Sequence, residues 1–218
     1  MGSMKTIWLA VALMAVLLPL PLQAEITEPF LVKDINPSTQ DSYPSQGVAL
    51  GSIFYFVASD GTNGYELWKS DGTEVGTVMV KDINNAGSSA PFPNPSSLAA
   101  VDGLLYFSAD DGINGSELWK TDGTEAGTVM VKDIRAGSGG SFPSGLTVVD
   151  RLLYFGASDG TNGYELWKSD GTEAGTVMVK DIRVGGCGSL LFSLTAVDGL
   201  LYFSTDDGTN GEELWKSD

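Results

Sequence analysis

The chain has 218 residues and a formal net charge of −16, from 28 acidic and 12 basic side chains. A surface this acidic argues against nucleic acid and anionic lipid as partners. The sequence has no histidine and one cysteine, which excludes imidazole ligands, an imidazole base, an internal disulfide and a thiolate zinc cluster.

The first 24 residues follow the order of a secretory signal peptide. Lys5 precedes an apolar run from Ile7 to Leu18, prolines follow, and Ala24 is the small residue at the expected cut. A membrane anchor is the alternative, but a helix of this length, at about 1.5 Å per residue, cannot cross about 30 Å of hydrocarbon. We therefore expect export with cleavage after Ala24, no membrane span, and a single domain at residues 25–218 that is secreted or at the cell surface.

One pattern is repeated four times in this domain. Val-Lys-Asp-Ile begins at positions 32, 80, 131 and 179, and Glu-Leu-Trp begins at positions 66, 117, 165 and 213, with spacings of 48 or 51 residues. A period of this length is typical of β-propeller blades or of two-helix solenoid units. We divide the domain into repeats at about 30–77, 78–128, 129–176 and 177–218.

The third repeat shows which elements each unit contains. Short apolar runs at Val129–Ile134, Leu146–Val149, Leu152–Ala157 and Tyr164–Ser169 are rich in β-branched and aromatic residues and are bounded by turn-forming residues. No segment keeps a helical apolar stripe for three turns. Asp-Gly pairs, as at Asp102-Gly103, predict tight hairpins. The sequence therefore predicts an all-β fold, a β-propeller of four-stranded antiparallel blades.

The Glu-Leu-Trp motif predicts packing between blades. Strand alternation places Leu67 and Trp68 on opposite faces, and a blade with a neighbour on each side buries both. The glutamates of the motif are expected to pair with the lysines of Val-Lys-Asp-Ile across strands. A glycosidase pair drawn from these carboxylates is disfavoured, because a general acid and base need different environments. The four glutamates are Glu66, Glu117, Glu165 and Glu213.

The two ends of the repeat array predict how the ring closes. Phe30–Ile35 matches the last strand of a unit, and the fourth repeat reaches Asp218 before that strand begins. We expect the N-terminal strand Phe30–Ile35 to pair with Glu212–Lys216, which completes the fourth blade and removes two open sheet edges. Two alternatives stay open: a fragment of a longer array, and two chains that close one eight-bladed ring. The protein is accordingly expected to be a monomer or a dimer.

The repeated octapeptide carries a family resemblance. Glu-Leu-Trp-Lys-Ser-Asp-Gly-Thr occupies positions 66–73 and 165–172 and recurs as far as Asp218 from position 213, while Thr121 replaces serine in the second copy. It resembles the ELWxxDGT repeat of secreted or surface proteins, chiefly bacterial, over residues 30–218. The resemblance implies a β-propeller-like repeat protein of the cell exterior, with no agreed catalytic residues to transfer.

Polar loops provide the first candidate ligand surface. Alternate loops of an up-and-down blade share a face, which places the Asp-Gly-Thr-Asn-Gly loops beside the long loops between blades. Their oxygens could also hold Ca²⁺, but the spacing does not match a D-x-D-x-D-G loop, so turn-forming roles are favoured. The candidate binding residues are Asp60, Asn63, Asp111, Asn114, Asp159, Asn162, Asp207 and Asn210, and the candidate calcium ligands are Asp60, Asp110, Asp111, Asp159, Asp206 and Asp207.

Apolar residues in the long loops provide the second candidate surface. Tyr43, Phe92 and Phe142 each precede a proline, and Leu190 takes that place in the fourth repeat. Exposed rings would suit the C–H face of a sugar, whereas buried rings would plug each loop onto its blade, and the plug is the favoured interpretation.

Two further features receive weaker interpretations. Cys187 could couple two chains, but we interpret it as incidental. Asn114-Gly115-Ser116 matches a glycosylation acceptor, a pattern short enough to arise by chance.

These observations together predict a non-catalytic extracellular module for binding or scaffolding. Its expected partner is an extracellular protein or a glycan, and it is expected to need no cofactor unless calcium binds. Two alternatives stay open: a carbohydrate-active enzyme that uses acidic residues of the propeller channel, which rests on analogy of fold, and a fragment without an independent role.

Overall fold

A computed structural model describes residues 28–84 and 96–218 of the chain. The predicted signal peptide, residues 1–24, lies outside the described residues. The chain divides into two units, Met1–Leu31 and Val32–Asp218, and residues 28–31 of the first unit are not in a strand. A search of the described ranges finds no helix that combines the length and hydropathy needed to cross a membrane.

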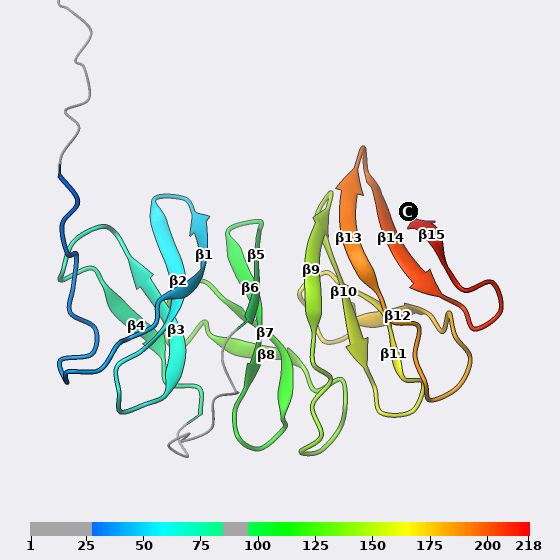
Figure 1. The fold of residues 1–218 in the computed structure, drawn as a ribbon, viewed down its shortest axis with the longest axis horizontal. Helices are drawn as coiled ribbons and strands as arrows, with labels where there is room; N and C mark the ends of the chain where they lie inside the picture. The colour runs from blue at the N-terminus through cyan, green and yellow to red at the C-terminus, as the bar shows by residue number, and fades with distance from the viewer. Residues whose placement is uncertain (1–27, 85–95) are drawn as a thin grey trace, which may run out of the picture. The chain divides into compact units, whose positions relative to one another are not determined.

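The described residues form fifteen β-strands in four antiparallel sheets, which we call blades 1 to 4 (Figure 1). Blades 1 to 3 each have four strands in chain order, and blade 4 has three. The predicted all-β fold of antiparallel blades is therefore confirmed, with four strands in three of the blades. The strands are β1 (Ser45–Leu50), β2 (Ile53–Ser59), β3 (Tyr65–Ser70), β4 (Val78–Lys81), β5 (Ser96–Val101), β6 (Leu104–Asp110), β7 (Ser116–Thr121), β8 (Val129–Lys132), β9 (Ser144–Val149), β10 (Leu152–Ser158), β11 (Tyr164–Ser169), β12 (Val177–Lys180), β13 (Phe192–Val197), β14 (Leu200–Asp206) and β15 (Glu212–Ser217).

The first strands of successive blades lie side by side. β1 contacts β5, β5 contacts β9, and β9 contacts β13. A tight hairpin joins the first and second strands of each blade, and Asp102, Asp150 and Asp198 have φ values of 50°, 54° and 49° there. The first central position of these turns takes positive φ, which Asp and Gly tolerate better than most residues.

Apolar cores fill the spaces between consecutive blades. Leu67 of blade 1 packs in one cluster with Phe107 and Trp119 of blade 2. The same pairing of a leucine with the tryptophan of the next blade recurs between blades 2 and 3, where Leu118 packs with Trp167. In blades 2 and 3 the leucine and tryptophan of the Glu-Leu-Trp motif thus face different blades, as strand alternation predicts.

The predicted ring-closing strand is not formed in the structure. Residues 30–35 are not in a strand, and blade 4 contains β13, β14 and β15 without a fourth strand. Val32–Asn36 instead lies against blade 1, where Lys33 Nζ donates to the Thr77 carbonyl at 2.8 Å and Ile35 packs with Phe56 and Trp68. The expected pairing of Phe30–Ile35 with Glu212–Lys216 is therefore not seen within this chain.

Candidate ligand-binding face

The Asp-Gly-Thr-Asn-Gly loops are turns in which the carboxylate of the aspartate accepts hydrogen bonds from residues of its own loop. Asp60 Oδ1 accepts the backbone N–H groups of Thr62 and Asn63, each at 2.8 Å, and its Oδ2 accepts Asn63 Nδ2 at 2.7 Å. Equivalent bonds form around Asp111, Asp159 and Asp207. Both oxygens of each carboxylate are occupied, which confirms the turn-forming role of these Asp and Asn residues.

Hydrogen bonds also set the charge state of these loops. Burial raises the pKa of Asp60, but hydrogen bonds from the backbone of Asn63 and Thr62 and from the Asn63 side chain outweigh burial, and the net pKa is below its ordinary value. The pKa of Asp207 is lowered chiefly by bonds from Asn210 and Thr209. The carboxylates therefore stay ionised at neutral pH and keep this face negative.

The long loops between blades 2 and 3 and between blades 3 and 4 lie next to these turns, as predicted. Ser141 N and Phe142 N in the loop between blades 2 and 3 both donate to the Ser116 carbonyl, at 2.9 and 3.0 Å. The loop between blades 3 and 4 repeats this contact, since Ser189 N donates to the Tyr164 carbonyl at 2.8 Å. Arg183 then reaches blade 4 and pairs with Asp206 at 3.1 Å. Two sets of loops that are far apart in sequence thus form one face.

Exposed apolar side chains project from this face on left-handed backbone. Tyr43, Phe142 and Leu190 have φ values of 46°, 53° and 51° and exposed fractions of 61%, 58% and 54%. The Tyr43 ring lies 6.5 Å from that of Tyr65, and the Phe142 carbonyl accepts a hydrogen bond from Tyr164 Oη at 3.4 Å. Because these side chains are exposed, the interpretation of Tyr43 and Phe142 as buried plugs is wrong.

The strand register corrects the predicted equivalence of Phe92. Tyr43, Phe142 and Leu190 each stand two residues before the first strand of a blade, at β1, β9 and β13. Counting back in the same way from β5 reaches Asn94, so Phe92 stands two positions earlier in its loop. Phe92 itself lies outside the described residues. That loop has three successive X-Pro pairs, so its sequence can be aligned with the other loops in more than one way.

The candidate calcium ligands are not gathered into a site. Within residues 28–84 and 96–218, no group of three His, Cys, Asp or Glu side chains is placed to hold a metal ion. Asp110 Oδ1 and Asp206 Oδ1 accept the N–H groups of Gly112 and Gly208, each at 2.7 Å. The remaining candidates, Asp60, Asp111, Asp159 and Asp207, each serve the turn of their own blade, which separates them from one another.

The predicted charge pairs between Glu-Leu-Trp and Val-Lys-Asp-Ile are wrong. Glu66, Glu117 and Glu165 are 3%, 0% and 0% exposed, and each accepts the backbone N–H of the isoleucine in Val-Lys-Asp-Ile. The lysines of the same motif turn away to the next blade: Lys81 Nζ donates to the Thr128 carbonyl and Lys132 Nζ to the Thr176 carbonyl, each at 2.8 Å. These bonds fasten strands and blades together, and no sequence pattern singled them out.

Burial raises the pKa of these glutamates. Burial raises the pKa of Glu66 to about 7, although hydrogen bonds from the backbone of Ile83 and Asn84 oppose the rise. Burial likewise raises the pKa of Glu117 and Glu165. In a cleft such carboxyls would be candidates for acid–base catalysis, but here they are buried and bound to backbone N–H groups. Their arrangement is structural.

Two minor candidates are also located. Cys187 is an exposed free thiol in the loop between blades 3 and 4. Asn114, the potential glycosylation acceptor, is half-buried and donates its side-chain amide to Asp111 Oδ2 at 2.8 Å.

Comparisons with known proteins support the fold alone. No family model matches the sequence, and the search of curated proteins found no match. A structure of a puromycin hydrolase S511A mutant complexed with PGG is similar with a TM-score of 0.54 and 16% identity, over 82% of this chain and 27% of that chain. A second puromycin hydrolase structure has a TM-score of 0.51 and 17% identity, over 80% and 26% of the two chains. The chain therefore spans about a quarter of these hydrolases.

Other matches are weaker in overall superposition. The computationally designed Ika4 protein has a TM-score of 0.47 and 16% identity, over 86% of this chain and 98% of that chain. BamB from Moraxella catarrhalis has a TM-score of 0.40 and 15% identity, over 79% and 43% of the two chains. Identities this low carry no information about ligands or activity.

Proposed function

We propose that this protein is an exported, non-catalytic recognition scaffold of the β-propeller type, and that its face of polar turns and exposed rings binds an extracellular glycan or protein. One observation carries the proposal: Tyr43 and Phe142 occupy the same place in two repeats, exposed and on left-handed backbone. Left-handed backbone costs a non-glycine residue about 1–2 kcal/mol. An exposed ring recovers little of that cost by burial, so folding alone does not account for the ring.

The chemistry of this face favours a sugar over an acidic ligand. An aromatic ring offers an apolar surface to the C–H groups of a sugar, and nearby amide and carboxylate groups offer hydrogen bonds to hydroxyls. The ionised carboxylates of Asp60, Asp111, Asp159 and Asp207 repel anions. We therefore infer a neutral or cationic glycan as the preferred ligand, with an extracellular protein as the alternative.

The architecture that would carry this face is a closed ring. We infer that β15 becomes paired when Phe30–Ile35 is added to its free edge, and the recurrence of Val-Lys-Asp-Ile at Val32 supports this pairing. We also infer that the repeat belongs with the ELWxxDGT proteins of the cell exterior, which the octapeptide motif supports. The alternative of a carbohydrate-active enzyme gains no support from Glu66, Glu117 and Glu165, since backbone N–H groups hold their carboxyls.

Glycine substitution tests the binding role separately from stability. Tyr43→Gly and Phe142→Gly remove the rings and also relieve the left-handed backbone, so the melting temperature should stay constant or rise. On glycan and protein arrays, with and without Ca²⁺, the double variant should lose at least tenfold in affinity. Asp150→Gly is the matched control: it relieves a φ of 54° in a hairpin turn and should leave binding unchanged. Arrays without signal, or full binding by the double variant, would contradict the proposal.

A further inference from the structure

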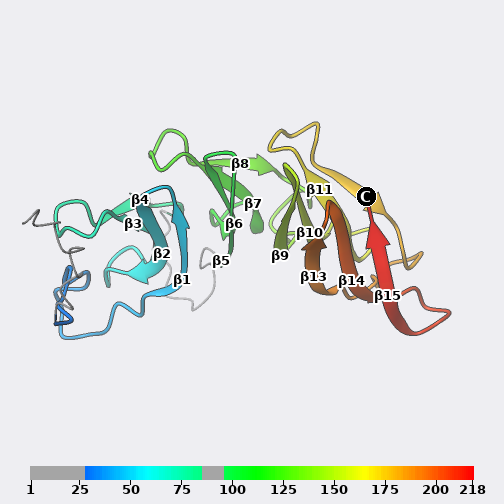
Figure 2. The same ribbon diagram turned by 90° about the horizontal axis from the view of Figure 1, so that it is seen from above.

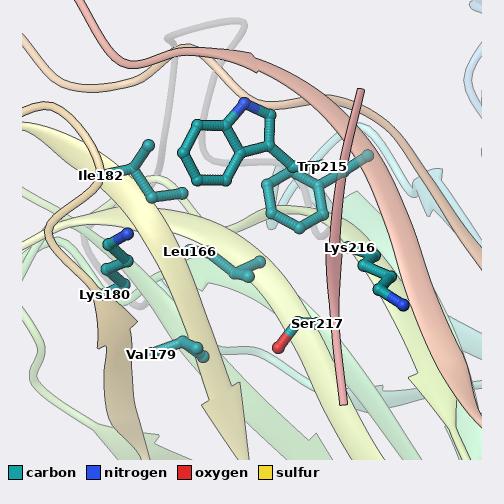
Figure 3. A pocket seen from close by; sticks show the side chains of 8 residues that line it. Leu166, Val179, Lys180, Ile182, Trp215, Lys216 and Ser217 are labelled. Carbon is teal, nitrogen blue, oxygen red and sulfur yellow. The ribbon is translucent and has the colours of Figure 1, made fainter. Parts of the chain in front are cut away.

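Blade 4 presents a free strand edge and an open pocket. β15 pairs with β14 on one side, and no described strand pairs with its other side (Figure 2). Leu214 is 76% exposed, whereas its counterpart Leu166 in blade 3 is 1% exposed. A pocket of about 140 Å³ opens beside Trp215, against Leu166 and Ile182 of blade 3 (Figure 3).

The complete blades show what covers the equivalent edge. In blade 3, β12 pairs with β11 so that Met178 stands opposite Trp167 and Lys180 opposite Leu166. Glu165 then accepts the backbone N–H of Ile182 at 3.0 Å. Blades 1 and 2 repeat the Met–Trp pairing and the bond from isoleucine to glutamate. An occupant of the β15 edge therefore needs an apolar residue opposite Trp215 and an N–H group for Glu213.

The sequence Phe-Leu-Val-Lys-Asp-Ile at residues 30–35 meets both requirements. Aligned with Val-Met-Val-Lys-Asp-Ile of blade 3, it places Leu31 opposite Trp215, Lys33 opposite Leu214, and the N–H of Ile35 at Glu213. The aligned segment matches the fourth strand at every apolar and charged position. It would convert the exposed edge into the arrangement seen in the other blades.

Part of this segment already makes the contacts of a fourth strand with the following blade. Lys33 Nζ donates to the Thr77 carbonyl of blade 1 at 2.8 Å, just as Lys81 of β4 donates to Thr128 of blade 2. Ile35 packs against Trp68 in the same way as Ile83 packs with Trp119. Val32–Asn36 thus already makes the contacts that a fourth strand makes with the following blade. The pairing of this segment with the third strand of a preceding blade is missing, and the free edge of β15 offers that pairing.

We propose that a second copy of this chain completes blade 4: residues 30–35 of one copy add to β15 of the other, and the reciprocal exchange closes a ring of two chains. This inference rests on the proposed ring and goes further by assigning the source of the closing strand. Within one chain the first strands follow the order β1, β5, β9, β13, and each contacts the next. β1 does not pack against β13 in the way that these successive strands do. Blade 1 of a second copy can therefore lie beside blade 4.

Reciprocal exchange defines the proposed assembly as a dimer. The donated segment and the β15 edge are different surfaces, so the contact is head-to-tail, and two copies that exchange segments pair both β15 edges. Each copy carries a formal charge of −16, so the copies repel each other at low ionic strength. Association is therefore expected to strengthen as salt screens that repulsion.

A disulfide between singly substituted chains tests the origin of the strand. Phe30 and Lys216 would stand opposite each other, as Val177 and Lys168 do in blade 3. In the exported protein, with Cys187→Ser in every chain, a tagged Phe30→Cys chain is mixed with an untagged Lys216→Cys chain and oxidised. We expect at least ten times more cross-linked heterodimer than with Val184→Cys, a matched cysteine at a position 88% exposed in a loop.

The remaining outcomes decide between the two closures. A disulfide that forms only within a chain carrying both Phe30→Cys and Lys216→Cys would overturn the exchange and leave the proposed ring intact. No disulfide in either case would overturn both. Light scattering provides a second measurement, in which the parent protein should have twice the mass of one chain. Leu31→Asp places a carboxylate opposite Trp215 and should reduce this mass to that of a single chain. The far-UV circular dichroism spectrum of the variant should be unchanged.

Discussion

Blades 2 and 4 contain nearly the same motif in different surroundings. In blade 2, Glu117 and Leu118 are 0% exposed, and β8 and the following blade cover them. In blade 4, Glu213 is exposed and Leu214 is 76% exposed, because among the described residues no fourth strand pairs with β15 and no further blade packs on the face that carries Leu214. Identical residues thus serve as core in one blade and as surface in the other. The neighbouring strand and blade, and not the motif alone, determine burial.

The comparison also explains why a carboxylate is tolerated in the interior. Glu117 Oε2 accepts the N–H of Ile134 at 3.0 Å, and Oε1 accepts those of Arg135 and Ser141 at 3.3 and 2.9 Å. Ile134 and Arg135 lie just beyond the end of β8, whereas Ser141 lies near the end of the following loop, where its N–H also donates to the Ser116 carbonyl. The carboxyl therefore replaces the hydrogen bonds that a continued strand would supply, which makes it part of the blade's framework.

Removing this carboxyl is expected to have the largest effect. Glu117→Ala leaves the backbone N–H groups of Ile134 and Arg135 without acceptors, while Ser141 N keeps its bond to the Ser116 carbonyl. At about 1–3 kcal/mol for each group that water does not reach, we expect a loss of about 2–5 kcal/mol in unfolding free energy. Glu213→Ala, at an exposed position, should change it by less than about 0.5 kcal/mol. Urea unfolding of dilute protein measures both. Equal losses would show that the fourth blade is already complete in solution.

Truncation of the leucine that follows this glutamate tests how much apolar packing contributes to stability in blades 2 and 4. Leu118→Ala empties a fully buried position and should cost about 3 kcal/mol, from lost burial and the cavity that remains. Leu214→Ala removes a side chain that is exposed in the single chain and should cost little in dilute protein. At high concentration Leu214→Ala should instead weaken dimerisation, measured by light scattering. A concentration-independent loss at Leu214 would contradict the described free edge.

The pH dependence of stability tests the effect of burial on Glu66. The pKa of Glu66 is raised from 4.5 to about 7 by burial, so the folded protein keeps this proton after the unfolded chain has released it. Stability contributed by this group is complete below about pH 4.5 and is lost as pH rises through 7. Glu66→Gln should reduce the slope of unfolding free energy between pH 5 and 7 by up to about 1.4 kcal/mol per pH unit. The parent protein under the same conditions is the reference, and an unchanged slope in Glu66→Gln would contradict the raised pKa of Glu66.

The sequence predicts repeated features well and their junctions poorly. The strand Tyr164–Ser169 was predicted to the residue, because apolar alternation and turn residues define a strand locally. The run Val129–Ile134 was predicted too long, since the N–H of Ile134 bonds to a glutamate side chain and not to the ladder. The local pattern of residues does not show this exchange of partners.

The candidate face likewise combines features that a local sequence pattern predicts with features that it does not. The turns around Asp60 and its counterparts follow from local hydrogen bonding, and their side chains were identified correctly. The exposure of Tyr43 and Phe142 could not be inferred, because an aromatic residue before a proline fits a buried plug as well as a surface ring. The left-handed backbone at these positions depends on how each loop meets its blade, which lies beyond a local pattern.

Ion pairs between blades should give the smallest effects. Arg151 and Asp102 join the hairpins of blades 3 and 2 at 2.9 Å, with side chains 81% and 50% exposed, whereas Arg183 and Asp206 are 34% and 32% exposed. Water and salt screen the first pair more strongly, so Arg151→Ala should cost less than about 0.5 kcal/mol and Arg183→Ala somewhat more. Urea unfolding in low and high NaCl measures the difference, which should shrink as salt rises. A larger loss for Arg151→Ala would mean that the hairpins, and not the apolar cores, set the spacing between blades 2 and 3.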